Sequence, residues 1–104
     1  MPDGSRLDKF VPVYPVKTAQ SGAVLEPETF YQFGEVGELN VTLAQKDDGK
    51  AHEFVLMFTP LKGFDKPVIV PEPVWFGKPQ FPAGEVCVVS VLNGLAVSGH
   101  GSII

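Results

Sequence analysis

The chain has 104 residues, of which 44% are hydrophobic and 19% charged, and its formal net charge at pH 7 is −4. This length corresponds to one domain with a single core, and the eight Lys and Arg residues form no cluster that would bind a phosphate backbone. The single cysteine excludes an internal disulfide. The first residues are polar and lack the apolar core of a signal peptide. The longest apolar run, 86–92, is too short to span a membrane as a helix, so the sequence predicts a soluble protein made in the cytoplasm.

Few charges are available to cover the surface of so small a protein. The excess of apolar residues indicates either packing against copies of the chain or a partner, or a well-filled core with scattered exposed valines. Eleven glycines and ten prolines argue against long helices, because proline is confined to turns, strand edges and extended segments.

Residues 1–29 predict an extended, proline-rich N-terminal arm. Pro12 and Pro15 alternate with apolar residues, which favours an extended or polyproline-like path. Such apolar side chains need a surface, so we expect the arm to dock on its own sheet as an edge strand or on a neighbouring subunit. Deletion of the arm is expected to leave a folded core and to abolish assembly. The expected arm and assembly contacts are Phe10, Val11, Val13, Tyr14 and Val16.

From Phe30 onward the pattern is one of strands and turns. Alternation of Leu39, Val41 and Leu43 with polar residues predicts a half-buried strand. The charged segment 45–50 contains Asp-Gly, a hairpin signal. Residues 54–58 are apolar on both faces of the next predicted strand, which indicates a central position between two layers or a face used for contact.

The C-terminal part continues this pattern. A short strand at 68–70 is bounded by prolines, as suits a sheet edge, and a loop follows that Trp75 anchors. The valine-rich run 85–92 is the longest predicted strand, and the Asn93-Gly94 turn leads into a last short strand. Six or seven short strands predict an all-β fold, namely a small β-sandwich or jelly-roll-like domain over residues 30–104.

No residue pattern indicates catalysis, a metal site or a cofactor. His52 and His100 are distant in sequence, and Cys87 lies inside a valine run where a thiol is a small buried hydrophobe with a raised pKa. Asp47 and Asp48 lack the further spaced oxygen ligands of a calcium loop. We therefore expect a protein that is not an enzyme and has no catalytic residues, metal ligands or cofactor.

The aromatic residues Trp75, Phe76 and Phe81 allow two interpretations. They can anchor the end of the core, or they can form a platform on which sugar rings stack. The first is the commoner role of such residues in a small β domain. The second predicts a carbohydrate-binding or adhesin module.

An ordered set of motifs between residues 30 and 99 resembles a module that recurs in virion proteins of tailed bacteriophages and prophages. The upstream part has Phe-Gly, alternating apolar residues, and then x-Glu-Phe-x-Leu-x-Phe-Thr; the downstream part has Trp, Gly and Pro, an Ala-Gly entry, a β-run and a closing Asn-Gly turn. The positions are Phe33, Gly34, Val36, Leu39, Val41, Leu43, His52, Glu53, Phe54, Leu56, Phe58, Thr59, Trp75, Gly77, Pro79, Ala83, Gly84, Ser90, Asn93, Gly94, Leu95, Ala96 and Val97.

The resemblance implies a non-enzymatic structural protein of a virion, either a capsid-associated decoration protein or a head-fibre protein. It implies assembly as a homo-oligomer, with a trimer as the first expectation, and contact with other virion proteins of the capsid or tail. We expect this assembly to use the apolar β faces and the N-terminal arm. A fibre tip of the tail or baseplate that touches a host surface glycan is the alternative. The arm is not part of the shared pattern, so we expect it to be an attachment device particular to this chain.

Overall fold

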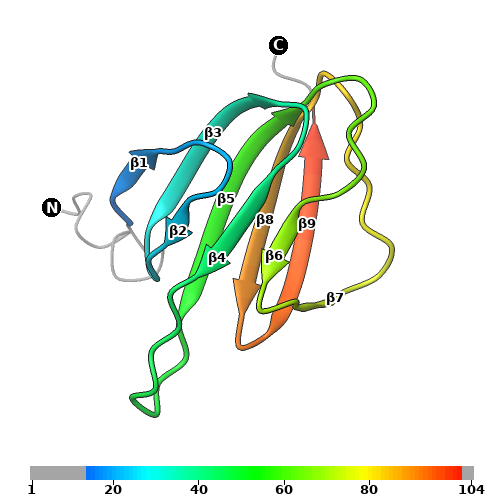
Figure 1. Ribbon diagram of the computed structural model, residues 1–104. Coiled ribbons are helices and arrows are strands. Elements are labelled where there is room, and N and C mark those ends of the chain that lie inside the picture. Colours follow the sequence, from blue (N-terminus) through cyan, green and yellow to red (C-terminus); the bar gives the residue numbers. More distant parts are fainter. Residues whose placement is uncertain (1–13, 102–104) are drawn as a thin grey trace, which may run out of the picture.

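The structure, a computed structural model, describes residues 14–101 and contains nine strands and no helix in that range. The all-β prediction is thereby confirmed. Six strands form one sheet in the order β1-β3-β5-β8-β9-β7, and three form a second sheet in the order β2-β4-β6 (Figure 1). The strands are β1 (Val16–Thr18), β2 (Val24–Leu25), β3 (Phe30–Val36), β4 (Asn40–Leu43), β5 (Glu53–Pro60), β6 (Val68–Val70), β7 (Val74–Trp75), β8 (Val86–Leu92) and β9 (Leu95–Gly101).

The chain passes back and forth between the two sheets. From β1 to β7 each successive strand belongs to the other sheet, so strands that neighbour each other within a sheet run in the same direction. Four strand pairs are parallel as a result. The pair β7–β9 is parallel as well, so five of the seven strand pairs are parallel. A jelly roll is built from antiparallel strands, and the pairing here differs from it in this respect.

The antiparallel part of the fold is the β8–β9 hairpin, which lies between β5 and β7 in the six-stranded sheet. Its turn has Asn93 at φ 54° and Gly94 at φ 81°. Two successive positive φ angles are the geometry of a two-residue type I′ turn, for which Asn-Gly is the favoured sequence. The turn predicted at Asn93-Gly94 is therefore present.

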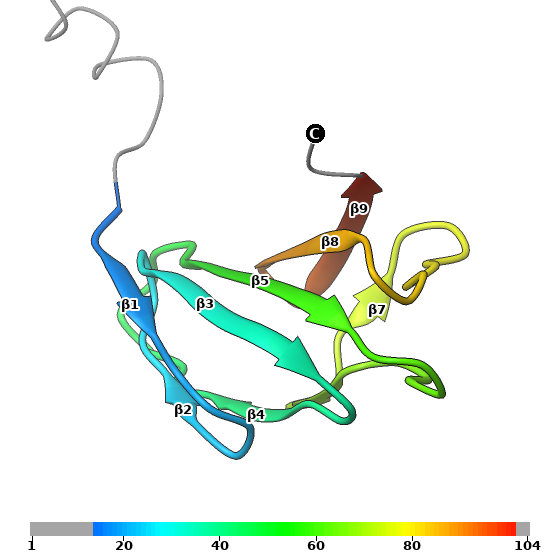
Figure 2. The ribbon, with the colours of Figure 1, turned by 90° about the horizontal axis from the view of Figure 1, so that it is seen from above.

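One core fills the space between the sheets, which Figure 2 shows as two layers with β2 and β4 beneath β3 and β5. Alternate residues of each strand point into it, as the two-residue period of a strand requires. The largest fully buried side chains are Leu25, Leu39, Leu56, Phe58, Pro60, Cys87 and Val89.

One local expectation differs from the structure. Segment 45–50 does not close a hairpin, because β4 pairs with β2 and β6 whereas β5 pairs with β3 and β8. The segment instead carries the chain from one sheet to the other. Residues 16–25, within the expected arm, form β1 and β2, which pair with β3 and β4 at the edges of the two sheets. An edge strand on the chain's own sheet was one of the two positions expected for the arm.

Other expectations agree with the observed elements. The strands expected near 39–43, 54–58 and 86–92 correspond to β4, β5 and β8, and β6 occupies an edge of the three-stranded sheet. Residues 14–101 contain no helix that is long and apolar enough to cross a membrane.

Candidate functional site

The side of the six-stranded sheet that faces away from the three-stranded sheet is here called the outer face (Figure 2). Strand register defines its members, because paired residues point to the same side of a sheet. Most of them are apolar. The outward residues are Val16, Thr18, Phe30, Gln32, Glu35, Glu53, Val55, Met57, Thr59, Val74, Val86, Val88, Ser90, Leu92, Leu95, Val97, Gly99 and Gly101.

The apolar character of the outer face is concentrated at its β8, β9 and β7 end. Leu92 is 47% exposed, Leu95 43% and Val97 47%, and Val74 on the edge strand is 70% exposed. The register places Val74, Leu95 and Leu92 side by side across three neighbouring strands. Single exposed apolar residues are common on proteins, but a contiguous row of them marks a contact surface.

The middle of the outer face is apolar as well. Phe30, Val55 and Met57 lie there on β3 and β5, and Val55 is only 9% exposed. These are the residues for which the sequence indicated either a central position between two layers or a contact face. Parallel strands such as β3 and β5 usually have both faces of their sheet covered. In the part of the chain that the structure describes, only one face is covered by a second sheet.

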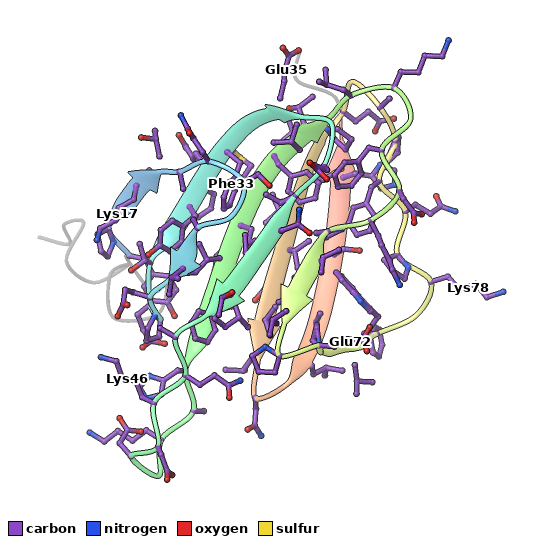
Figure 3. All side chains as sticks on the ribbon, in the orientation of Figure 1. Lys17, Phe33, Glu35, Lys46, Glu72 and Lys78 are labelled. Carbon is purple, nitrogen blue, oxygen red and sulfur yellow. The ribbon has the colours of Figure 1, made fainter. Side chains whose placement is uncertain are left out.

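Charged groups are confined to the ends of the outer face. Among its described strand residues only Glu53 and Glu35 are ionisable, and each lies at an end of a strand pairing. Figure 3 shows Glu35 projecting from one end of the molecule, and Lys17, Lys46, Glu72 and Lys78 around the periphery. The centre of the outer face therefore offers no charge that two packed surfaces would have to desolvate.

Glu53 is bound within the chain by two hydroxyl groups. The Tyr14 hydroxyl donates to Oε1 at 2.8 Å, and the Ser90 hydroxyl donates to Oε2. The hydrogen bond to Glu53 and, to a smaller extent, partial burial raise the pKa of Tyr14 to about 12. Of the expected arm contacts, Tyr14 is therefore bound to the outer face of its own chain. Val16 on β1 is 62% exposed. Phe10, Val11 and Val13 lie outside the described residues.

A second polar cluster joins the β2–β3 connection to the β4–β5 connection. His52 Nδ1 lies 2.7 Å from Glu28 Oε1, and His52 Nε2 lies 2.9 Å from both carboxylate oxygens of Asp48. Glu28 Oε2 also accepts a hydrogen bond from the Glu53 N–H at 2.6 Å. The imidazole therefore connects two loops that lead into β3 and β5.

The three side chains of this cluster shift one another's pKa values. Hydrogen bonds to Glu28 and then to Asp48 raise the pKa of His52, and the hydrogen bond from His52 lowers the pKa of Asp48. For Glu28 the largest single effect, partial burial, raises the pKa, but hydrogen bonds from His52 and from the Glu53 N–H together outweigh it and lower the value. A charged imidazolium between two carboxylates is the favoured state.

This cluster does not form a metal site. The two ring nitrogens of His52 face different carboxylates, so the three side chains do not converge on one point, and no group of three metal-ligating residues occurs within the described range. A hollow of about 150 Å³ beside the cluster is lined in part by Lys46, Lys50 and Asn93. Both ring nitrogens of His52, which also lines this hollow, are already hydrogen-bonded to Glu28 and Asp48.

Two of the three predicted aromatic residues, Trp75 and Phe81, pack against the core. The ring of Trp75 contacts Phe81 edge-on, with centroids 5.8 Å apart at 72°, and Phe81 in turn packs on Phe58 and Phe64. Phe76 is 69% exposed and lies outside this aromatic cluster. The rings of Trp75 and Phe81 share no common plane, and a flat stacking platform would need one. The arrangement instead fits packing against the core.

Cys87 is fully buried on β8, and burial raises the pKa of its thiol, with a smaller effect of Glu85. Such a thiol is protonated at neutral pH and out of contact with solvent. Its position among core residues matches the small buried hydrophobe expected from the sequence.

The comparisons with protein-family models, with curated proteins and with solved structures find no match for this chain. The sequence predicted assembly through apolar β faces and through named residues of the arm, but it assigned no contact to Val74, Leu92, Leu95 or Val97. The available signal was the alternation of Leu95 and Val97 with Ala96, which places two large apolar residues on the face opposite the buried alanine.

Proposed function

We propose that this protein is a non-enzymatic structural protein of a bacteriophage virion that assembles through its outer face and its N-terminal arm. In this proposal it is a capsid-associated decoration protein or a head-fibre protein, built as a small two-sheet β-sandwich. The observation that carries the assembly role is the outer face itself, on which Leu92, Leu95 and Val97 are each more than two-fifths exposed. The virion setting is supported by the motif resemblance over residues 30–99.

The exposed apolar surface of the outer face is unfavourable in water. Burying apolar surface yields about 25 cal/mol per Å², so a sheet face of this size is stabilised strongly by any apolar cover. The described chain provides such a cover on one side of the six-stranded sheet only. A structural protein has a permanent neighbour. Such a neighbour accounts for an outer face whose centre carries no charge and which no described part of the same chain covers.

The polar clusters support the same conclusion. Glu53 is held by Tyr14 and Ser90, and His52 is held by Glu28 and Asp48, so the conspicuous titratable groups serve to join segments of the fold. A general base or nucleophile has to be open to a substrate in a cleft. The structural use of these groups favours a protein whose activity is binding.

The proposal is tested by asking whether the chain is a component of particles. Particles released from cells that carry the gene would be purified on a density gradient and probed for the chain. We expect it to co-sediment with the particles, and we expect Leu95→Lys to abolish incorporation. Leu61→Lys is the matched control, because Leu61 is 44% exposed and Leu95 is 43% exposed, but Leu61 lies in the loop after β5. Absence of the wild-type chain from particles would contradict the proposal.

A further inference from the structure

We infer that the outer face is covered by the outer face of a second copy of this chain, in a two-fold pair of six-stranded sheets packed face to face. This inference rests on the proposed function, since it names the partner of the same surface. It differs from the expectation of a trimer drawn from the motif resemblance. Four features of the described residues carry it.

The first feature is chemical self-complementarity. A two-fold interface places the same patch on both sides, so every residue type in the patch has to tolerate its own kind. The central rows of the outer face, such as Phe30–Val55–Ser90–Val97 and Gln32–Met57–Val88–Gly99, contain only apolar and neutral polar residues. Two such surfaces meet without bringing like charges together.

The second feature is the distribution of charge over the chain. Each copy carries a net charge of −4, so two copies repel each other when charged surfaces approach. The outer face has carboxylates only at its ends, and both oxygens of Glu53 already accept hydrogen bonds from Tyr14 and Ser90. Close contact through its centre therefore buries no carboxylate that lacks partners.

The third feature is size. Six strands spaced about 4.8 Å apart, together with a β8 strand that rises about 3.4 Å per residue, give a patch of roughly 500 Å² on each copy. A pair would bury about 1,000 Å² in total, which reaches the lower limit for a specific protein–protein interface. Aligned sheets pack about 10 Å apart with their side chains interdigitated, and Gly99 and Gly101 leave room for larger residues of the partner.

The fourth feature is the parallel pairing of β1, β3 and β5. Parallel sheets are found with both faces covered, and here the three-stranded sheet covers one face. A second copy supplies another layer of β-structure on the other face. The resulting order of layers would be three-stranded sheet, six-stranded sheet, six-stranded sheet and three-stranded sheet.

The test is the mass of the full-length chain in solution, measured by sedimentation equilibrium over a range of concentrations. We expect a mass of two chains for the wild type and a twofold lower mass for Leu95→Lys and for Val97→Lys. Leu61→Lys and Val70→Lys are expected to keep the mass of two chains. Val70 is the control for the other sheet, because it is 53% exposed on the outward side of the three-stranded sheet. Circular dichroism of each variant establishes that it is folded.

The alternative occupants give different results. A chain lacking residues 1–13 that falls to the mass of one chain would show that the arm makes the contact, and it would overturn the face-to-face pair. A wild-type mass of one or three chains would also overturn it. A single-chain mass in solution, with the chain nevertheless present in particles, would leave the proposed function standing and assign the outer face to a different virion protein.

Discussion

Replacement of Leu25 by Ala tests whether residues 16–25 belong to the fold. Leu25 lies on β2, within the segment that the sequence suggested is an arm, and its side chain is fully buried between the sheets. Its carbonyl accepts a hydrogen bond from the Ala44 N–H at 2.8 Å, next to the pairing of β2 with β4. If this part of the chain were only an attachment device, truncation of Leu25 would leave the stability of the core unchanged.

The magnitude follows from the loss of apolar contact. Truncating a buried leucine removes about three methylene equivalents at about 0.8 kcal/mol each, and the cavity adds to this, so the free energy of unfolding should fall by about 3 kcal/mol. The neighbouring Val24 is 61% exposed, and Val24→Thr keeps a β-branched side chain, so that control should change stability by less than about 0.5 kcal/mol. Urea unfolding followed by circular dichroism measures both. Equal, small effects of the two substitutions would refute the assignment of β2 to the core.

Three further predictions concern named side chains. The pKa of His52 is raised and the pKa values of Glu28 and Asp48 are lowered, so the stability difference between wild type and His52→Gln should be greatest between about pH 4.5 and 6.5. The difference should shrink as the pH rises through the raised pKa of His52 and as it falls through the lowered pKa values of the two carboxyl groups. Urea unfolding at each pH measures this difference, and a difference that does not change with pH would contradict the cluster. Trp75→Ala should destabilise by about 2 kcal/mol, less than a fully buried Trp, and an unchanged urea midpoint would place the indole outside the core. Tyr14→Phe should cost about 1 kcal/mol through the lost hydrogen bond to Glu53, whereas an unaltered stability would argue that Tyr14 is not held there.

Local signals in the sequence predicted much of the fold. The alternation of Leu39, Val41 and Leu43 corresponds to β4, and Asn93-Gly94 forms the turn between β8 and β9. These features depend on the two-residue period of a strand and on the positive φ angles that Asn and Gly tolerate. They are properties of neighbouring residues and need no knowledge of the tertiary fold.

The pairing of the strands could not be predicted in the same way. Asp-Gly in segment 45–50 has the composition of a hairpin turn, yet β4 and β5 belong to different sheets. Whether two successive strands pair or separate is decided by the packing of the whole chain, and a local turn sequence is compatible with both. Segment 16–25 contains no proline, but its strands β1 and β2 are only three and two residues long. Strands this short show no clear two-residue alternation, so their bounds could not be predicted from the pattern of apolar residues.

The candidate surface was only partly visible in the sequence. Apolar residues on both sides of β5 indicated a contact face, but Val74 and Leu95 are 21 residues apart and become neighbours only through the parallel pairing of β7 with β9. The Glu28–His52–Asp48 cluster was likewise hidden, because it depends on the juxtaposition of two connections between sheets. Long-range neighbours of this kind follow from topology.

Assembly as proposed here requires that the outer face is covered in the assembled protein. Carbene footprinting of the assembly, read by mass spectrometry, compares labelling at Leu92, Leu95 and Val97 with labelling at Leu61. In the single chain these side chains are 47%, 43%, 47% and 44% exposed, so equal access would label them about equally. We predict strong protection of the three outer-face residues and full labelling of Leu61. Labelling of all four to the same extent would contradict the claim.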